Sequence, residues 1–188
     1  MRILGIDPGS QITGIGIIDA EKGGSANQHV FSESLKLPKG ELSKRLGAIY
    51  QRLEIVIREY KPQVIALEKV FLAKNPQAAL TLGHARGAAM LAGVNAGLDV
   101  YEYSATEIKK TIVGRGRADK AQVQHMVKAL LQLKEQPEVD ESDALACALC
   151  HVHQSQSPAA AAGSIKGTVR SGALKGYSKD VIARMKIQ

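Results

Sequence analysis

The spacing of apolar residues along the chain predicts alternating strands and helices. Arg2 to Ile6 is a short β-rich run, and Thr13 to Asp19 forms a second run after a Pro-Gly-Ser-Gln turn. A third strand is expected from His29 to Leu37. Because only turn-like segments separate these runs, they predict a consecutive antiparallel meander.

The apolar period then changes from strand-like to helical. Apolar residues recur at steps of three and four, at Leu42, Leu46, Ile49, Leu53 and Ile57. Short apolar runs at 64–68 and 99–103 predict two more strands, and further helices are expected at about 76–96, 107–113, 120–133 and 141–153. Interleaved strands and helices predict an α/β layered domain. Gly83, Gly87 and Gly93 permit close packing of helix 76–96, within the monomer or against a second subunit.

Charge is distributed unevenly over the 188 residues, whose net charge is +7. From Ser155 onward, six basic residues stand against one acidic residue, so this segment carries +5. The sequence therefore predicts a domain over 1–154 and a basic, flexible tail over 155–188. Such a tail either binds nucleic acid or is a solvated chain end, and its charge is compatible with both.

Other features narrow the functional class. No apolar stretch reaches the roughly 18 residues needed to cross a bilayer, and the first residues enter a strand at once, so we expect a cytoplasmic protein with no membrane partner. Cys147, Cys150 and His151 match a haem-attachment spacing, and with His153 they resemble a zinc cluster. Both cysteines lie in an apolar helical run, which favours buried thiols instead.

Acidic residues at the ends of predicted elements are the candidate chemistry. Asp7 ends the first strand, Glu68 ends the fourth, and Asp140 and Asp143 open the last helix three residues apart. If the first and fourth strands are parallel neighbours, Asp7 and Glu68 emerge at the same sheet end. As alternatives, Asp7 and Glu68 are solvated turn residues, and Asp140 is a helix N-cap with Asp143 as the acid at the third helical position.

Converging carboxylates require a counter-charge. Two of them about 4 Å apart repel by roughly 4 kcal/mol at an effective dielectric of 20. An all-oxygen ligand set favours a hard cation, Mg²⁺ with Mn²⁺ as a substitute. Two ions about 3.5–4 Å apart support in-line phosphodiester hydrolysis, one activating water and the other stabilising the departing 3′-oxygen. Asp7, on the central strand, is expected to bridge both ions.

These residues lie in segments that resemble the RuvC family of bacterial Holliday junction resolvases. The resemblance covers Met1 to about Gln154 in order and spacing, and it rests on the following segments: Ile3-Leu4-Gly5-Ile6-Asp7-Pro8-Gly9-Ser10, Glu68-Lys69-Val70-Phe71-Leu72-Ala73-Lys74-Asn75, Leu82-Gly83-His84-Ala85-Arg86-Gly87, Thr111-Ile112-Val113-Gly114, Lys120-Ala121-Gln122-Val123-Gln124-His125-Met126-Val127 and Asp140-Glu141-Ser142-Asp143-Ala144-Leu145-Ala146.

The resemblance implies an RNase H-like fold, a five-stranded mixed sheet flanked by helices, with the first strand central. It implies a homodimer that resolves four-way DNA junctions by paired symmetric nicks, in homologous recombination and DNA repair, together with the RuvA–RuvB branch-migration motor. The catalytic, metal-binding carboxylates of the family fall on Asp7, Glu68, Asp140 and Asp143. Its base-stacking aromatic falls on Phe71, its DNA-contacting lysines fall on Lys109 and Lys120, and cutting near a thymine-rich site is implied.

The residues themselves support parts of this hypothesis and leave alternatives open. Phe71 follows a strand end in a chain with only two Phe, although a core position is its plain alternative. Arg115 and Arg117 lie between Lys109 and Lys120 and could extend a phosphate-contacting edge. Lys69 stands where family members often carry Gln, which adds a cation beside Glu68.

Other functions remain to be separated from junction cleavage. The Asp-Pro-Gly-Ser turn at Asp7, with Gly14 and Gly16, resembles the phosphate hairpin of actin-like ATPases, but those folds need about twice this length. A non-catalytic junction-binding protein and an RNase H-like nuclease acting on RNA or an RNA–DNA hybrid are the two other classes.

Overall fold

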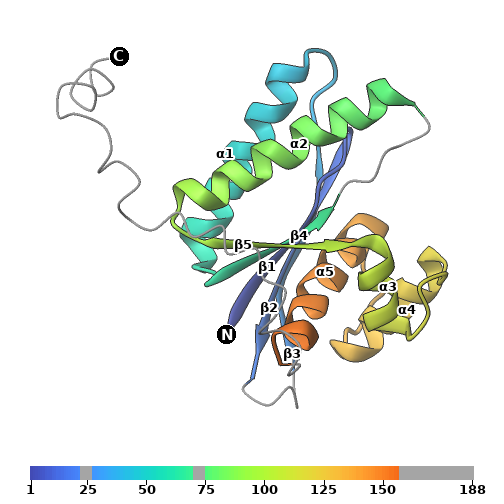
Figure 1. Ribbon diagram of the computed structural model, residues 1–188. Coiled ribbons are helices and arrows are strands. Elements are labelled where there is room, and N and C mark those ends of the chain that lie inside the picture. The colour runs from blue at the N-terminus through green and yellow to red at the C-terminus, as the bar shows by residue number, and fades with distance from the viewer. Residues whose placement is uncertain (22–26, 70–74, 157–188) are drawn as a thin grey trace.

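A five-stranded sheet forms the centre of the computed structural model, which describes residues 1–21, 27–69 and 75–156. The strands stand in the order β3-β2-β1-β4-β5 (Figure 1). Their bounds are Arg2–Asp7 for β1, Ile12–Ala20 for β2, Asn27–Lys36 for β3, Val64–Lys69 for β4 and Asp99–Ser104 for β5. β1, β2 and β3 pair antiparallel, whereas β4 pairs parallel with both β1 and β5. The predicted meander, the central first strand and the mixed sheet are confirmed.

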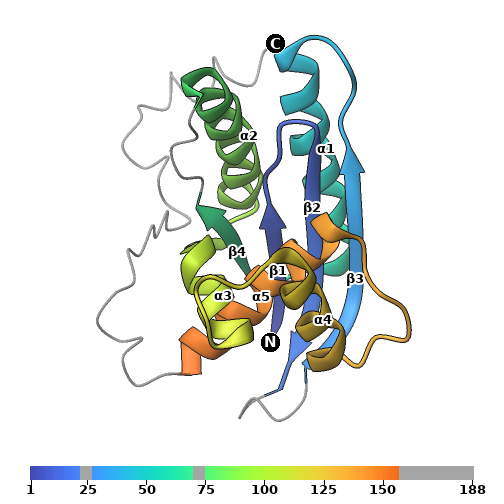
Figure 2. The same cartoon turned by 90° about the vertical axis from the view of Figure 1, so that its right-hand side faces the viewer.

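Helices cover both faces of this sheet and give three layers. Figure 2 shows α1 and α2 on one side and α3, α4 and α5 on the other. Their bounds are Leu42–Tyr60 for α1, Pro76–Asn95 for α2, Ala105–Val113 for α3, Lys120–Leu130 for α4 and Val139–Gln156 for α5. Among the described residues, no helix is both long and apolar enough to cross a bilayer.

Alternating residues of the strands build two separate cores. Leu4 and Ile6 of β1 are fully buried with α1 and α2, whereas Ile3 is buried with α3, α4 and α5. Side chains alternate across a strand, so residues at odd positions of β1, Asp7 included, face α5. The same alternation in β4 places Ala66 in the core beneath α5 and, two residues on, directs Glu68 to that face. The acids are thus on one side of the sheet.

Two predicted helix starts are wrong by two residues. α3 begins at Ala105 rather than Glu107 because Ser104 caps it: the Ser104 hydroxyl accepts the Glu107 amide hydrogen at 3.2 Å, and the Glu107 carboxylate accepts the Ser104 amide hydrogen at 2.7 Å. α5 begins at Val139 rather than Glu141. Asp140 therefore lies inside the first helical turn, and the N-cap interpretation of this residue is wrong.

The end of α4 also differs from the prediction. The apolar run had placed it at Leu133, but the helix ends at Leu130. Gln132 takes a left-handed φ of 51°, and the Leu133 amide donates to the Lys128 carbonyl oxygen at 3.0 Å, which closes the helix. The proposed tail lies almost wholly outside the described residues, so the domain boundary after residue 154 stays a prediction.

Candidate active site

Three glycines let α5 lie directly on the sheet. A Cβ atom on Gly5 would come 2.0 Å from the Ala144 carbonyl oxygen, and one on Gly14 would come 2.0 Å from the Asp140 carbonyl oxygen. A Cβ atom on Gly16 would meet Leu145 at 2.8–2.9 Å. No larger residue fits at these positions unless α5 moves away.

This close packing brings the first turn of α5 to the end of β1. Gly14 is the direct cross-strand partner of Asp7, so the backbone of Asp140 passes over the residue beside Asp7. On the other side of β1, the parallel strand β4 carries Glu68 one position beyond the pairing of Ile6 with Leu67. The four predicted acids are thereby collected on one side of the sheet, and all four are half-buried.

The electrostatics of Asp7 and Glu68 show that the acids lie close together. Burial and the charges of Asp143 and Asp140 together raise the pKa of Asp7 to about 6, while Lys120 and a hydrogen bond with Glu68 oppose the shift. Burial and then the charges of Asp7 and Asp143 raise the pKa of Glu68 to about 8. A neutral Glu68 carboxyl therefore donates to Asp7, which is how two acids share a half-buried site at neutral pH.

Lys120 supplies a positive charge to this group. Its ammonium lies 3.1 Å from Oδ2 of Asp143, whose side chain is 19% exposed, while the Lys120 side chain is 67% exposed. The predicted assignment of Lys120 to the DNA-contacting edge did not anticipate this ion pair.

A second contact holds the start of α5 against β3. The Ser32 hydroxyl donates to Glu141 Oε2 at 3.0 Å and lies 3.1 Å from His29 Nε2. Because Glu141 follows Asp140 directly, this contact orients the helical turn that carries the acids.

The donor chemistry of the four acids fits a hard divalent cation, since they offer only carboxylate oxygens. Burial of Asp7 and Glu68 together also leaves negative charge that a cation would stabilise. In the parts of the chain that the structure describes, no three His, Cys, Asp or Glu side chains are grouped closely enough to hold a metal ion as they stand. A metal site here needs side-chain rearrangement, including at the Lys120–Asp143 pair.

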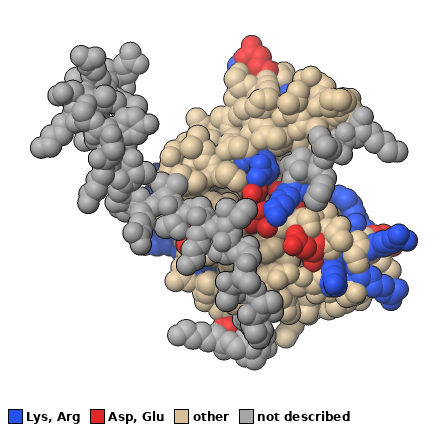
Figure 3. All heavy atoms as spheres, in the orientation of Figure 1, with Lys and Arg blue, Asp and Glu red and all other residues tan. Residues whose placement is uncertain are grey.

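The predicted DNA-contacting residues differ in how exposed they are in the structure. Lys109 is half-buried on α3 and Lys120 is exposed at the start of α4, while Arg115 and Arg117 are exposed in the loop between these helices. Figure 3 shows Lys and Arg gathered over this region, at the right of the molecule. Phe71 lies outside the described residues.

The cysteines lie in the core, as predicted. Cys147 and Cys150 are free thiols with no exposed surface. Burial raises the pKa of Cys147 well above its ordinary range and that of Cys150 to about 11, so both thiols are protonated at neutral pH. A haem or zinc site at these residues is therefore not supported by their surroundings.

Comparison with known proteins agrees with the geometry. The sequence model of the family described as crossover junction endodeoxyribonuclease RuvC matches residues 3–151. A protein of that name from Marinobacter nauticus is 48% identical over 173 residues, which are 92% of this chain and 97% of the relative. One from Tolumonas auensis is 49% identical over 168 residues, covering 89% and 96%.

Solved structures of RuvC proteins are also similar to this chain. RuvC of Thermus thermophilus superposes with a TM-score of 0.75 at 34% identity, covering 82% of this chain and 95% of that one. The same protein in complex with a Holliday junction substrate superposes with a TM-score of 0.75 at 35% identity, covering 81% and 93%. The chain therefore belongs to the RuvC family of crossover junction endodeoxyribonucleases.

Proposed function

We propose that this chain resolves four-way DNA junctions by hydrolysing one phosphodiester in each of two symmetry-related strands at the Asp7–Glu68–Asp140–Asp143 cluster. The observation that carries the proposal is the convergence of acids from β1, β4 and α5, where burial and then the charges of Asp7 and Asp143 raise the pKa of Glu68 to about 8. Acids that only form ion pairs at the surface do not need to lie this close to one another. The acids of nucleases that cleave phosphodiesters with metal ions do.

The four acids would hold Mg²⁺, or Mn²⁺ in its place, with two ions in each site. When bound, the ions supply an activated water and stabilise the departing 3′-oxygen. Asp7 has Glu68 on the neighbouring strand and the α5 acids across Gly14, so its carboxylate would hold metal together with acids on both sides of it. Glu68 must give up its proton to act as a ligand, since only the carboxylate form binds the ion well.

A homodimer fits the outer face of α1 and α2. A groove of about 390 Å³ between these helices is lined largely by apolar atoms and includes Leu46, Tyr50, Gly87 and Leu91. Leu91 is 51% exposed, and a Cβ atom at Gly83 or Gly87 would meet nothing within 4 Å. A Cβ atom on Gly93 would instead lie 2.4 Å from the Ile65 side chain, so this glycine packs within the monomer. We propose that a second copy of this chain covers the groove.

The remaining roles follow from family membership and stay proposals. Lys109 and Lys120 would contact junction phosphates, with Arg115 and Arg117 extending this edge. Phe71 would stack on an unpaired base, which stabilises by roughly 1–3 kcal/mol. We further propose cutting near a thymine-rich site, cooperation with the RuvA–RuvB motor, a cytoplasmic location, and a basic tail after residue 154 that is separate from the nuclease domain.

Cleavage of a substrate panel tests this function. The protein is incubated with a mobile four-way junction, a linear duplex and an RNA–DNA hybrid, each with Mg²⁺ or with EDTA. We expect paired nicks in the junction alone and only with Mg²⁺. Binding of the junction without nicking would favour a non-catalytic junction-binding protein, and cleavage of the hybrid would favour an RNase H-like activity.

The Asp7→Asn variant tests whether the acid cluster carries out the cleavage. This variant should bind the junction like the unaltered protein and leave it uncut, whereas Asp99→Asn, at an exposed acid at the start of β5, should cut normally. Substantial cleavage by Asp7→Asn would remove the cluster from the mechanism.

A further inference from the structure

Lys120 occupies a position that helix stability does not favour. It is the first residue of α4, directly after the Asp119 cap, and the first turn of this helix contains no acidic residue. The N-terminus of a helix carries partial positive charge, so a cation there is unfavourable for the helix. The advantage of a lysine at this position must come from what its side chain contacts.

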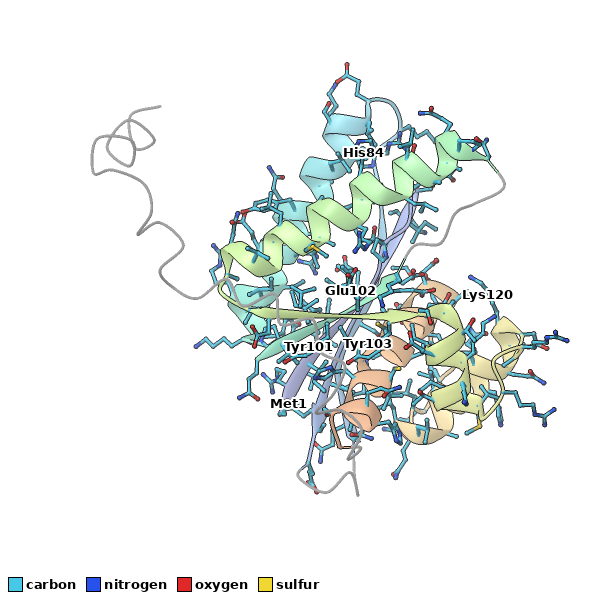
Figure 4. All side chains as sticks on the ribbon, viewed as in Figure 1. Met1, His84, Tyr101, Glu102, Tyr103 and Lys120 are labelled. Carbon is cyan, nitrogen blue, oxygen red and sulfur yellow. The ribbon has the colours of Figure 1, made fainter. Side chains whose placement is uncertain are left out.

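That contact is the carboxylate cluster. Figure 4 labels Lys120 on the side of the sheet that carries α5. Its ammonium lies 3.1 Å from Asp143 Oδ2. Its charge also lowers the pKa of Asp7 and of Glu68, and Asp140 in turn raises the pKa of Lys120, so the ammonium is within electrostatic reach of all four acids. Over the described ranges, the other ion pairs involve acids elsewhere in the chain.

We propose that Lys120 is a tethered counter-ion of the cluster, which must release Asp143 before the cluster binds a divalent cation. The inference rests on the proposed function, because it takes the four acids as the metal site. An ammonium group has three donors and no acceptor, so it cannot coordinate a metal, and it repels one. Lys120 and a metal ion therefore compete for the same oxygen.

Breaking the ion pair between Lys120 and Asp143 costs little free energy. An ion pair whose lysine is 67% exposed contributes little, because solvent screens it and the long side chain loses freedom. A divalent ion, held by several carboxylates, displaces such a partner. The freed ammonium then lies beside the metal site, where a junction phosphate would replace Asp143 as its partner. One residue would thus neutralise the acids before metal binding and contact DNA afterwards.

Titration with Mn²⁺ by calorimetry, without DNA, tests this role on the full chain. Lys120→Met removes the competing charge and should bind Mn²⁺ roughly three- to tenfold more tightly than the unaltered protein. Lys110→Met, an equal charge change at an exposed residue of α3, should change the affinity by less than about twofold. With EDTA at pH 8, Lys120→Met should also unfold at a lower temperature, and saturating Mn²⁺ should abolish that difference.

Equal or weaker Mn²⁺ binding by Lys120→Met would overturn the counter-ion role. Asp7→Asn in the same titration separates this failure from a failure of the proposed function. If Asp7→Asn weakens Mn²⁺ binding while Lys120→Met leaves it unchanged, only the role of Lys120 is wrong. If Asp7→Asn binds Mn²⁺ like the unaltered protein, the acids are not the metal site.

Discussion

Asp7 and Glu68 make the folded chain sensitive to pH in the absence of metal. Their folded-state pKa values, about 6 and about 8, lie above the ordinary values of 3.8 and 4.5. The folded protein therefore binds more protons than the unfolded chain between these limits, so the stability that these groups contribute is full below about pH 4 and is lost as the pH rises toward 8.

We expect the free energy of unfolding in EDTA to fall from pH 6 to pH 8.5 by more in the unaltered protein than in Glu68→Gln. One pKa unit corresponds to about 1.4 kcal/mol, so the difference should reach on the order of a few kcal/mol. Urea denaturation at several pH values measures it, with Glu135→Gln as an exposed control. Parallel pH profiles for Glu68→Gln and the unaltered protein would show that Glu68 is not held protonated.

Gly14 should be as important to the site as the acids. In Gly14→Ala the new Cβ atom would lie 2.0 Å from the Asp140 carbonyl oxygen, so the first turn of α5 must move away from Asp7. We expect a loss of roughly 1–3 kcal/mol in stability and the loss of most junction cleavage.

Gly47→Ala is the matched control for Gly14→Ala. Gly47 lies within α1 with open space around its Cβ position in the monomer, so alanine there should stabilise the folded chain by about 0.5–1 kcal/mol where Gly14→Ala destabilises it. Unfolding curves and junction cleavage assays check both variants. Full cleavage by Gly14→Ala would show that the approach of α5 does not set the site.

The sequence revealed the acids but not what brings them together. Asp7 and Glu68 end apolar runs, which is visible without a structure, whereas the distance between α5 and the sheet is a tertiary property. The signal for it was Gly14 and Gly16 alternating with isoleucines, because glycine within a strand often marks close approach of another backbone. The ion pair of Lys120 with Asp143 joins residues 23 apart and has no sequence signature.

At the scale of elements, a partly buried hydrogen bond joins β5 and α5. Tyr103 pairs in register with Glu68 and its hydroxyl lies 2.7 Å from His151 Nδ1. Figure 4 shows Tyr101 and Tyr103 on the α5 side of β5, opposite to Glu102. Burial lowers the pKa of His151 to about 4, so its imidazole is neutral, and its tautomer decides whether Nδ1 accepts from or donates to the tyrosine hydroxyl.

Tyr103→Phe should therefore cost about 1–3 kcal/mol, because the His151 nitrogen loses its partner while remaining buried. The urea midpoint measures this cost, and junction cleavage at low temperature should persist because the acids keep their positions. Tyr60→Phe, which keeps the ring that stacks on Phe31, should have a small effect. An unchanged midpoint in Tyr103→Phe would mean that the contact does not join the two elements.

Element types were predictable because periodicity reports burial, and element ends were less so. The amphipathic spacing located α1, and the short apolar runs located β4 and β5. The ends depend on local caps. The Ser104–Glu107 capping box is visible in the sequence and marks the start of α3, whereas the left-handed Gln132 that closes α4 is not one of the residues usual at such a position.

At the scale of the whole molecule, the groove between α1 and α2 should control assembly. Gly87→Glu adds a charge where there is open space in the monomer, so the chain should fold but fail to pair. Light scattering after size-exclusion chromatography should give the mass of two chains for the unaltered protein and for the exposed control Gln28→Glu, and of one chain for Gly87→Glu. A dimeric Gly87→Glu would place the interface elsewhere.

Diffraction from crystals soaked in Mn²⁺ tests the central claim most directly. Anomalous peaks should lie between Asp7, Glu68 and the first turn of α5, within about 2.0–2.3 Å of carboxylate oxygens, and the Lys120 ammonium should have left Asp143. Ordered Mn²⁺ bound only at other sites, with the Lys120–Asp143 pair intact at saturating metal, would contradict the account.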